Sequence, residues 1–174
     1  ASSSSVYGAN IKMPYSENNK TDTQLSLYAS TKKSVESISH AYSYLWKIPI
    51  TMMRFFTVYG PWGRPDMALF SFTDKALKNK NIDIFNKGKM FRDFTYIDDV
   101  VSSIISLIKK KPLLIKGKKF SNDSISNVAP YRVVNIGNSK KINLITFVNI
   151  LEKKLGLKIK KNFVGLQKGD VKST

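Results

Sequence analysis

The stretch that decides the fold is SLYASTKKSVESISHAYSYLWKIPITMMRFF, residues 26–56. Its first part predicts an amphipathic helix from Ser26 to about Lys47, because apolar residues recur along one side of a helical projection. That apolar stripe comprises Leu27, Val35, Ile38, Ala41, Tyr42 and Leu45. Pro49 separates the helix from ITMMRFF, a continuous apolar run typical of a strand buried on both faces. A helix followed at once by such a strand indicates an α/β fold.

The same alternation extends outward from this stretch in both directions. The segment Ala1–Val6 has the character of the end of a buried strand, and a polar loop then continues to about Gln24. Further helices are expected at about 68–78, 97–110 and 143–155, and further strands at 82–85, 131–137 and 157–163. A long polar loop is expected over 111–130. Strands that alternate with helices predict βαβ units and a largely parallel sheet.

The composition limits the chemistry that the chain can perform. Of its 174 residues, 42% are hydrophobic, which is enough to build a core. There is no cysteine and a single histidine, His40, so the sequence predicts no disulfide and no metal site. The apolar runs are too short to span a bilayer, and the first residues do not resemble a signal peptide. We therefore expect a cytoplasmic protein without a membrane partner.

The net charge of +17 invites a nucleic-acid interpretation. However, the arginines that commonly contact base edges are few, and the remaining basic residues are lysines. The arginines are Arg54, Arg64, Arg92 and Arg132. The lysines gather in KKKP, KGKK, NSKK and KLGLKIKK, which we expect at loops and helix ends. Solvated surface charge is favoured over a functional polyanion site, and no nucleic-acid partner is expected.

Within the opening stretch, Tyr28 and Lys32 are four residues apart and share a face of the predicted helix. Taken alone this pair is weak evidence, because a chain so rich in lysine contains about one such pair by chance. A surface phenol over a lysine stem would also explain it. Its position just after a polar loop favours a cleft, where the ammonium would stabilise a phenolate. Ser3, at the end of the first strand, could then supply a hydroxyl donor.

Four blocks in order carry a resemblance to a known family. They are SSSSVYG at 2–8, Tyr28-x-x-x-Lys32, RFFTVYGPWGRPDMALF at 54–70 and FRDFTYIDDV at 91–100. With these blocks the chain resembles the extended short-chain dehydrogenase/reductase family, the NAD-dependent epimerases and dehydratases of nucleotide sugars. It is most similar to the UDP-glucuronate 4-epimerase branch. The resemblance covers nearly the whole chain, including YRVVNIGNS and the terminal QKGDV.

The resemblance implies a redox-neutral epimerisation at C4 of a UDP-sugar, with a tightly held NAD as cofactor. Tyr28 would be the general base that takes the proton of the 4-hydroxyl group. Lys32 would hydrogen-bond the nicotinamide ribose and keep Tyr28 ionised, while Ser3 would donate to the same sugar oxygen. Phe55 and Phe56 would flank the nicotinamide.

The resemblance also implies how the sugar would be bound. In related dehydratases and decarboxylases, acidic residues occupy one or both positions after the serine, whereas here they are Ser4 and Ser5. Without a carboxylate there, plain epimerisation is favoured over dehydration, with serines simply tolerated at a strand end as the alternative. Thr57 would reach the sugar. Arg64 would bind the C6 carboxylate of glucuronate through two hydrogen bonds, with a loop-stabilising contact as the alternative.

Two further residues would bind the nucleotide. Arg92 matches the family arginine that holds the UDP diphosphate, a task suited to its forked guanidinium; a purely structural arginine is the alternative. Asp170 fits a carboxylate that accepts hydrogen bonds from the ribose hydroxyls of UDP. Substrate contacts are therefore expected to extend to the last residues of the chain.

The implied fold is the second half of a Rossmann-like parallel sheet together with a smaller α/β substrate-binding domain. We expect the cofactor-binding part over residues 1–66 and the nucleotide-sugar part over 67–174, with a returning Rossmann segment at about 94–136. No glycine-rich phosphate loop follows a first strand. We therefore expect a C-terminal fragment that is by itself inactive, from an enzyme that is a homodimer when intact.

Three alternatives remain open from the sequence. A 4-epimerase of UDP-glucose and UDP-galactose and a UDP-glucuronate decarboxylase belong to the same family. A non-catalytic basic binding domain on the same scaffold is a different class of protein, and it would bind nucleic acid in a salt-sensitive manner.

Overall fold

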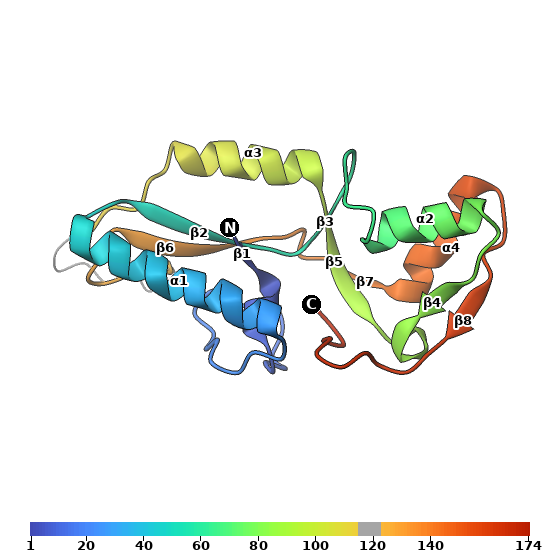
Figure 1. The fold of residues 1–174 in the computed structure, drawn as a ribbon. Coiled ribbons are helices and arrows are strands. Elements are labelled where there is room, and N and C mark those ends of the chain that lie inside the picture. The colour runs from blue at the N-terminus through green and yellow to red at the C-terminus, as the bar shows by residue number, and fades with distance from the viewer. Residues whose placement is uncertain (115–122) are drawn as a thin grey trace. The chain divides into compact units, whose positions relative to one another are not determined.

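In the computed structural model, residues 1–114 and 123–174 are described. Residues 115–122, which belong to the predicted loop 111–130 and include the KGKK cluster, lie outside the described residues. The chain forms two compact units (Figure 1). The first comprises residues 1–56 and 98–137, and the second comprises residues 57–97 and 138–174.

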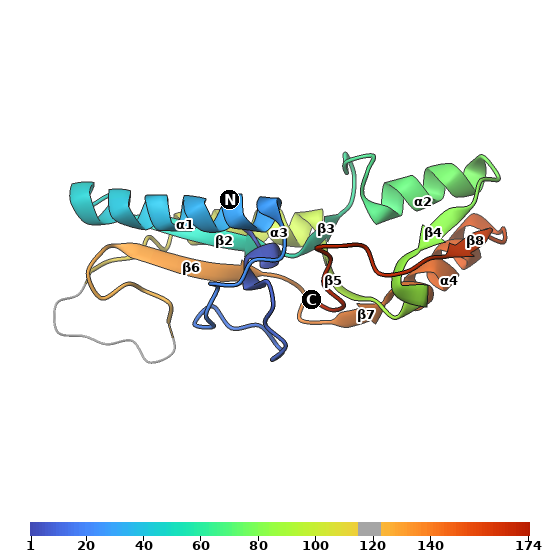
Figure 2. The ribbon, with the colours of Figure 1, turned by 60° about the horizontal axis from the view of Figure 1, so that its bottom comes forward.

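The first unit is built on a parallel sheet in the order β1-β2-β6. Its strands are β1 (Ser2–Ser3), β2 (Ile50–Phe55) and β6 (Tyr131–Ile136), and its α-helices are α1 (Leu27–Trp46) and α3 (Ile97–Ile108). The two helices lie on opposite faces of the sheet (Figures 1 and 2). Successive side chains of β2 point to opposite faces of the sheet. Arg54 binds Glu36 of α1 on one face, whereas Thr51 and Met53 line a groove shared with α3 on the other.

Helix α1 begins at a sequence-encoded cap, because the Ser26 hydroxyl accepts a hydrogen bond from the Ala29 amide at 3.2 Å. The apolar stripe predicted for this helix is not its buried face: its large residues are exposed, including Leu27 at 87%. The sheet instead meets Ala29, Glu36 and Ser43. The predicted helix is confirmed, and on its sheet-facing side Glu36 is paired with Arg54 of β2. No described helix, the long α1 included, has the length and apolarity to cross a membrane.

That ion pair joins Glu36 of α1 to Arg54 of β2, and each side chain is only 3% exposed. Both guanidinium bonds to the carboxylate are 2.8 Å long, and the Ser2 hydroxyl donates to it at 2.6 Å. Burial alone would raise the pKa of the Glu36 carboxyl, but the hydrogen bonds from Arg54 and Ser2 outweigh burial and lower that pKa. Glu36 is therefore an anion held inside the protein.

The second unit contains two small sheets and two α-helices. Its strands are β3 (Thr57–Tyr59), β4 (Ile82–Ile84), β5 (Phe91–Tyr96), β7 (Lys141–Asn143) and β8 (Lys161–Phe163), and its α-helices are α2 (Ala68–Leu77) and α4 (Leu144–Leu155). Strand β5 lies between parallel β3 and antiparallel β7, while β4 pairs with β8 in parallel. The core comprises Ala76, Ile82, Ile84, Val148, Leu151 and Ile159.

The predicted helices and five of the predicted strands are present, whereas three strands of the second unit were missed. The chain is an α/β protein with parallel sheets, but the parallel pairing is divided among small sheets and β7 is antiparallel. Strands β3, β5 and β7 were not predicted. Strand β3 follows β2 after a single residue, β5 runs directly into α3, and β7 runs directly into α4, so no turn separates these strands from their neighbours in the sequence. Two short 3₁₀ helices, η1 (Ser4–Tyr7) and η2 (Phe85–Gly88), were likewise unpredicted.

The core of the second unit generates the first prediction. Ile84 is fully buried, so Ile84→Ala should lower the free energy of unfolding by about 2–5 kcal/mol, measured by urea denaturation. Ile150→Ala is the matched control, because Ile150 lies on α4 but is 55% exposed. Its effect should stay within about 0.5 kcal/mol. Equal losses from the two substitutions would contradict the assigned core.

The ion pair generates the second prediction. Because the pKa of Glu36 is lowered in the folded state, its contribution to stability is present above its ordinary pKa of 4.5 and is lost as the pH falls through the folded value. At pH 7, Glu36→Gln should lower the free energy of unfolding by about 3–5 kcal/mol, since it leaves Arg54 buried without a counter-charge.

This loss should shrink progressively as the pH falls below 4.5, which urea denaturation of the unsubstituted and Glu36→Gln proteins at decreasing pH would measure. Comparing the two proteins removes the contributions of Asp66 and Glu152, whose pKa values are also lowered, by Arg64 and Lys161. Asp22→Asn is the control, because Asp22 makes only an exposed ion pair at 3.9 Å. A loss that does not change with pH would exclude the linkage.

Candidate functional site

The serine block of the sequence forms the end of β1 and the first turn after it. Ser3 is the last residue of β1 and caps η1, its hydroxyl accepting a hydrogen bond from the Ser5 amide at 3.2 Å. Ser3 is 8% exposed, whereas Ser4 and Ser5 are half-buried. The Ser3 hydroxyl also donates to the Ser5 hydroxyl at 3.2 Å. These hydroxyls therefore cluster at the carboxyl end of a parallel strand, where α/β proteins commonly bind ligands.

Tyr28 and Lys32 lie on one face of the first turns of α1. The Lys32 ammonium is 5.8 Å from the centre of the Tyr28 ring and donates a hydrogen bond to the Ala1 carbonyl at 3.3 Å. Tyr28 is 53% exposed, and its hydroxyl makes no hydrogen bond within the described part of the chain. The structure thus joins Lys32 to both the phenol and the start of the serine strand, and it leaves the phenol accessible to a ligand.

Phe55 is the last residue of β2, beside the serine strand, and Phe56 follows it. Phe55 is the register partner of Ser3, and the Phe56 amide donates to the Ile136 carbonyl at 3.2 Å. Both aromatic side chains are half-buried. The strand pairing therefore places Ser3 and Phe55 at the carboxyl ends of neighbouring strands in the first unit.

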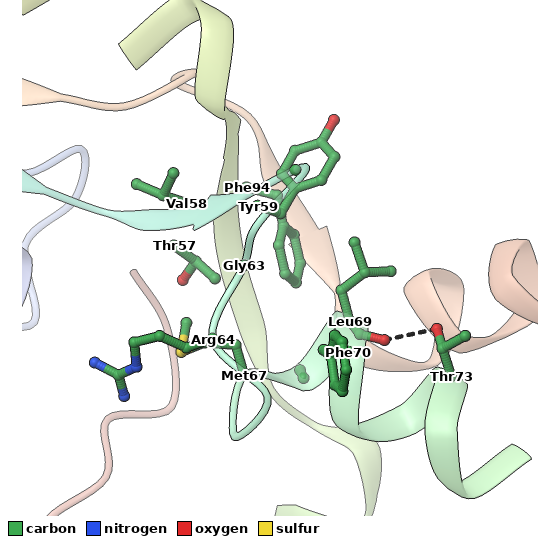
Figure 3. Close-up of a pocket in the computed structure, with 12 residues that line it drawn as sticks. Thr57, Val58, Tyr59, Gly63, Arg64, Met67, Leu69, Phe70, Thr73 and Phe94 are labelled. Atoms are coloured by element: carbon green, nitrogen blue, oxygen red, sulfur yellow. Dashed lines mark hydrogen bonds between the residues drawn. The ribbon is translucent and has the colours of Figure 1, made fainter. Parts of the chain in front are cut away.

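The remaining predicted residues belong to the second unit. Thr57 and Arg64 lie in or after β3, and both contribute to a pocket of about 180 Å³ (Figure 3). The pocket is lined by Thr57, Val58, Tyr59, Gly60, Gly63, Arg64, Met67, Ala68, Leu69, Phe70, Thr73 and Phe94. Its walls are mostly apolar, and its volume suits a part of a ligand rather than a whole nucleotide sugar. The Arg64 side chain extends away from Leu69 and Phe70 (Figure 3).

Arg64 already binds a carboxylate in this structure. Its Nε donates to Asp66 Oδ1 at 3.0 Å, and its Nη2 donates to Asp66 Oδ2 at 2.5 Å. The hydrogen bonds from Arg64 hold the pKa of the exposed Asp66 carboxyl below its usual value. The guanidinium is thus oriented for two-point carboxylate binding, while Asp66 also makes it a loop-stabilising residue, as the alternative interpretation required. Sequence reasoning missed Asp66, although a carboxylate two residues from an arginine was a visible signal.

Arg92 and Asp170, both predicted to bind the nucleotide, are brought together by the second unit. Arg92 Nη2 donates to Asp170 Oδ1 at 2.7 Å, and both side chains are partly buried. The bond holds the terminal segment against β5, where the Phe91 amide also donates to the Lys172 carbonyl at 2.9 Å. Two residues 78 positions apart in sequence therefore form one polar cluster.

These contacts also bear on which residues could hold a dinucleotide. The free Tyr28 hydroxyl and the adjacent Lys32 ammonium fit a ribose, and the half-buried Phe55 and Phe56 fit a planar ring. Sequence reasoning also missed Glu36 as the anchor of the helix that carries Tyr28. Its signal was a carboxylate four residues after Lys32, the same spacing as that between Tyr28 and Lys32.

Comparison with known proteins gives these contacts a context. Residues 1–121 match the NAD dependent epimerase/dehydratase family. The chain is 52% identical to Protein CapI of Staphylococcus aureus and 49% identical to the probable UDP-glucuronate 4-epimerase of Rhizobium meliloti (strain 1021). Each alignment covers 100% of this chain and 52% of the relative, so the chain spans about half the length of the curated relatives it matches.

A solved structure agrees with this placement. The chain superposes with a TM-score of 0.81 on the UDP-glucuronic acid 4-epimerase of Bacillus cereus, crystallised with UDP-glucuronic acid and NAD. The two are 35% identical, and the match covers 98% of this chain and 49% of that one. Since the family match extends over more than half of its residues, the chain belongs to the NAD dependent epimerase/dehydratase family.

Proposed function

We propose that this chain supplies the catalytic and sugar-binding residues of an NAD-dependent enzyme that converts UDP-glucuronate to UDP-galacturonate. The observation that carries the proposal is the pairing of Tyr28 and Lys32 on one face of α1, with Lys32 bonded to Ala1 at the start of the serine strand. A phenol, an ammonium and serine hydroxyls are the groups needed to move a proton at a sugar alcohol.

In the proposed mechanism, Tyr28 accepts the proton of the sugar 4-hydroxyl group. The Lys32 ammonium stabilises the phenolate form of Tyr28 by Coulomb attraction, and the Ser3 hydroxyl donates a hydrogen bond to the reacting oxygen. Held by Tyr28, Lys32, Phe55 and Phe56, NAD would supply the reversible hydride chemistry that a change of configuration at C4 requires. Tyr28 then gives the proton back, so the reaction needs no net oxidant.

The choice of a uronic acid substrate rests on Arg64 and on the serine block. Arg64 binds the Asp66 carboxylate at two points, and the C6 carboxylate of glucuronate is proposed to replace Asp66 there. The exchange should be inexpensive because the existing pair is exposed. Ser4 and Ser5 offer no carboxylate for dehydration, and Thr57 at the pocket rim is proposed to contact the sugar.

The nucleotide is proposed to bind at the Arg92 cluster of the second unit. Arg92 would contact the UDP diphosphate, and Asp170 would accept hydrogen bonds from the ribose hydroxyls. The second unit is thus proposed to be the nucleotide-sugar part, and the first unit the Rossmann-like cofactor part. Its NAD contacts would come from Tyr28, Lys32, Phe55 and Phe56.

Two further proposals concern the activity of the chain by itself and its dimerisation. The sequence has no glycine-rich loop for the NAD pyrophosphate, so the chain alone should bind NAD weakly and show little turnover. The apolar stripe of α1 is exposed, with Ile38 at 57% and Leu45 at 62%, which supports dimerisation through this helix.

The catalytic proposal is tested by joining this chain to the part of the Bacillus cereus epimerase that it does not match. The joined protein should bind NAD and convert UDP-glucuronate to UDP-galacturonate. Chromatography of the nucleotide sugars would measure this conversion. Tyr28→Phe should lower kcat by about 10²–10⁴, because it removes the general base. Tyr42→Phe is the control, since Tyr42 lies on the exposed side of the same helix. Full activity of Tyr28→Phe would refute the catalytic assignment.

Arg64 provides the test of substrate choice. Arg64→Ala should lower kcat/KM for UDP-glucuronate by about 10- to 100-fold, corresponding to about 1.5–3 kcal/mol for hydrogen bonds between charged groups. Turnover of a neutral UDP-hexose, where present, should be unchanged.

Other results would favour the alternative functions. Preference for UDP-galactose in the unsubstituted protein would indicate a 4-epimerase of UDP-glucose and UDP-galactose, and release of CO₂ and a UDP-pentose would indicate a UDP-glucuronate decarboxylase. Salt-sensitive binding of nucleic acid without turnover would indicate a basic binding domain.

A further inference from the structure

The Glu36 carboxylate collects its donors from separate elements of the first unit. Oε1 accepts hydrogen bonds from Ser2 Oγ of β1 at 2.6 Å and from Arg54 Nε of β2 at 2.8 Å. Oε2 accepts from Arg54 Nη2 at 2.8 Å, and the Lys33 ammonium lies 3.8 Å away. The Glu36 backbone carbonyl accepts from the Tyr131 hydroxyl of β6 at 3.2 Å. One residue of α1 is therefore bonded to every strand of the sheet.

The strand residues that bind the Glu36 carboxylate, Ser2 and Arg54, are themselves held in place by further contacts. Ser2 and Arg54 are register partners in the β1–β2 pair, so their side chains emerge side by side toward α1. Arg54 also lies over the Tyr7 ring, with its guanidinium carbon 4.8 Å from the ring centre, and donates to the Glu17 carbonyl at 3.3 Å. These contacts fix the orientation of the Arg54 guanidinium that pairs with Glu36.

The two strand residues that bond the Glu36 carboxylate are each adjacent to a proposed functional residue. Ser2 precedes Ser3 in β1, and Arg54 precedes Phe55 in β2. Along α1, Lys32 is one turn and Tyr28 two turns before Glu36, or about 6 Å and 12 Å along the helix axis. Because α1 runs antiparallel to β2 (Figure 1), both lie toward the carboxyl ends of the strands. A shift of α1 at Glu36 would therefore move Tyr28 relative to Ser3.

Besides Glu36, α1 contacts β6 through the His40 ring, which meets the Tyr131 ring edge-on at 4.9 Å, whereas the large apolar side chains of α1 are exposed. The buried face has only the small side chains of Ala29 and Ser43 besides Glu36, so it lacks large apolar groups that would interlock with the sheet. A buried ion pair contributes little net stability compared with apolar packing, because its desolvation is costly. Its hydrogen bonds are directional, however, and that property suits placement of a helix better than stabilisation.

We propose that Glu36 is a positioning residue, which through Ser2 and Arg54 sets the helix carrying Tyr28 and Lys32 in register with the strand carrying Ser3. The inference rests on the proposed function for its catalytic consequence, but its structural part concerns this chain alone. Ser2 is the more informative position to change, because removing its hydroxyl cuts the bond to β1 while leaving the Glu36–Arg54 pair in place.

The experiment compares Ser2→Ala with Ser43→Ala. Ser43 is the matched control, because it is a fully buried serine whose hydroxyl has no hydrogen-bond partner among the described residues. In the 174-residue chain, NMR should show shifts of the Tyr28, Lys32 and Ser3 signals in Ser2→Ala and none of them in Ser43→Ala. Ser2→Thr, which keeps the hydroxyl, should restore the original Tyr28 and Lys32 signals.

In the joined enzyme described above, Ser2→Ala should lower kcat by about 10- to 100-fold with KM little changed, as expected for a misplaced catalytic group. Ser43→Ala should retain kcat, and Ser2→Thr should recover most of it. Assays well below the unfolding temperature separate this effect from a loss of stability.

Two outcomes would overturn the inference. The first is unchanged Tyr28 and Lys32 signals in Ser2→Ala, and the second is a fall in unfolding temperature with kcat retained. An unsubstituted joined enzyme that binds NAD but leaves UDP-glucuronate unchanged would refute the proposed function instead. The NMR comparison would then still decide whether Glu36 sets the position of the helix.

Discussion

The first unit depends on one buried ion pair between a helix and a sheet. Glu36 and Arg54 are each almost completely withdrawn from solvent, and each satisfies the other's charge through two hydrogen bonds. Because an unpaired charge at this position would be strongly unfavourable, the helix and the strand can adopt few alternative arrangements. The placement of Tyr28 and Lys32 at the start of the same helix follows from this restriction.

The second unit also contains arginine–carboxylate ion pairs, and these are more exposed to solvent than the Glu36–Arg54 pair. Arg64 and Arg92, the two arginines proposed to bind substrate anions, are each bonded to a carboxylate of the chain, Asp66 and Asp170. Each guanidinium is therefore oriented before any ligand arrives. The exposed Arg64 pair can exchange partners readily, whereas the partly buried Arg92 pair also holds the terminal segment against β5.

Membership of the epimerase/dehydratase family places these contacts in a wider context. The chain spans about half the length of its relatives, and the part it contains carries the serine strand, the Tyr28 helix and the Arg64 loop. These features form within the two units as they stand. The division of the chain at residues 56–57 and 97–98 separates the residues proposed for proton transfer from those proposed for nucleotide binding.

The sequence alone determined the α/β class, the long elements and the family, because helix periodicity, a buried apolar strand and four ordered motifs are local signals. From their motifs it also predicted functional roles for Tyr28, Lys32 and Arg64. The tertiary structure decided which face of α1 is buried, since periodicity marked the apolar stripe and could not reveal that Arg54 would meet Glu36. It likewise decided the strands β3, β5 and β7 and the pairing of Arg64 with Asp66 and of Arg92 with Asp170. Short pairings and ion pairs depend on what lies opposite in space, and one-dimensional spacing does not contain that information.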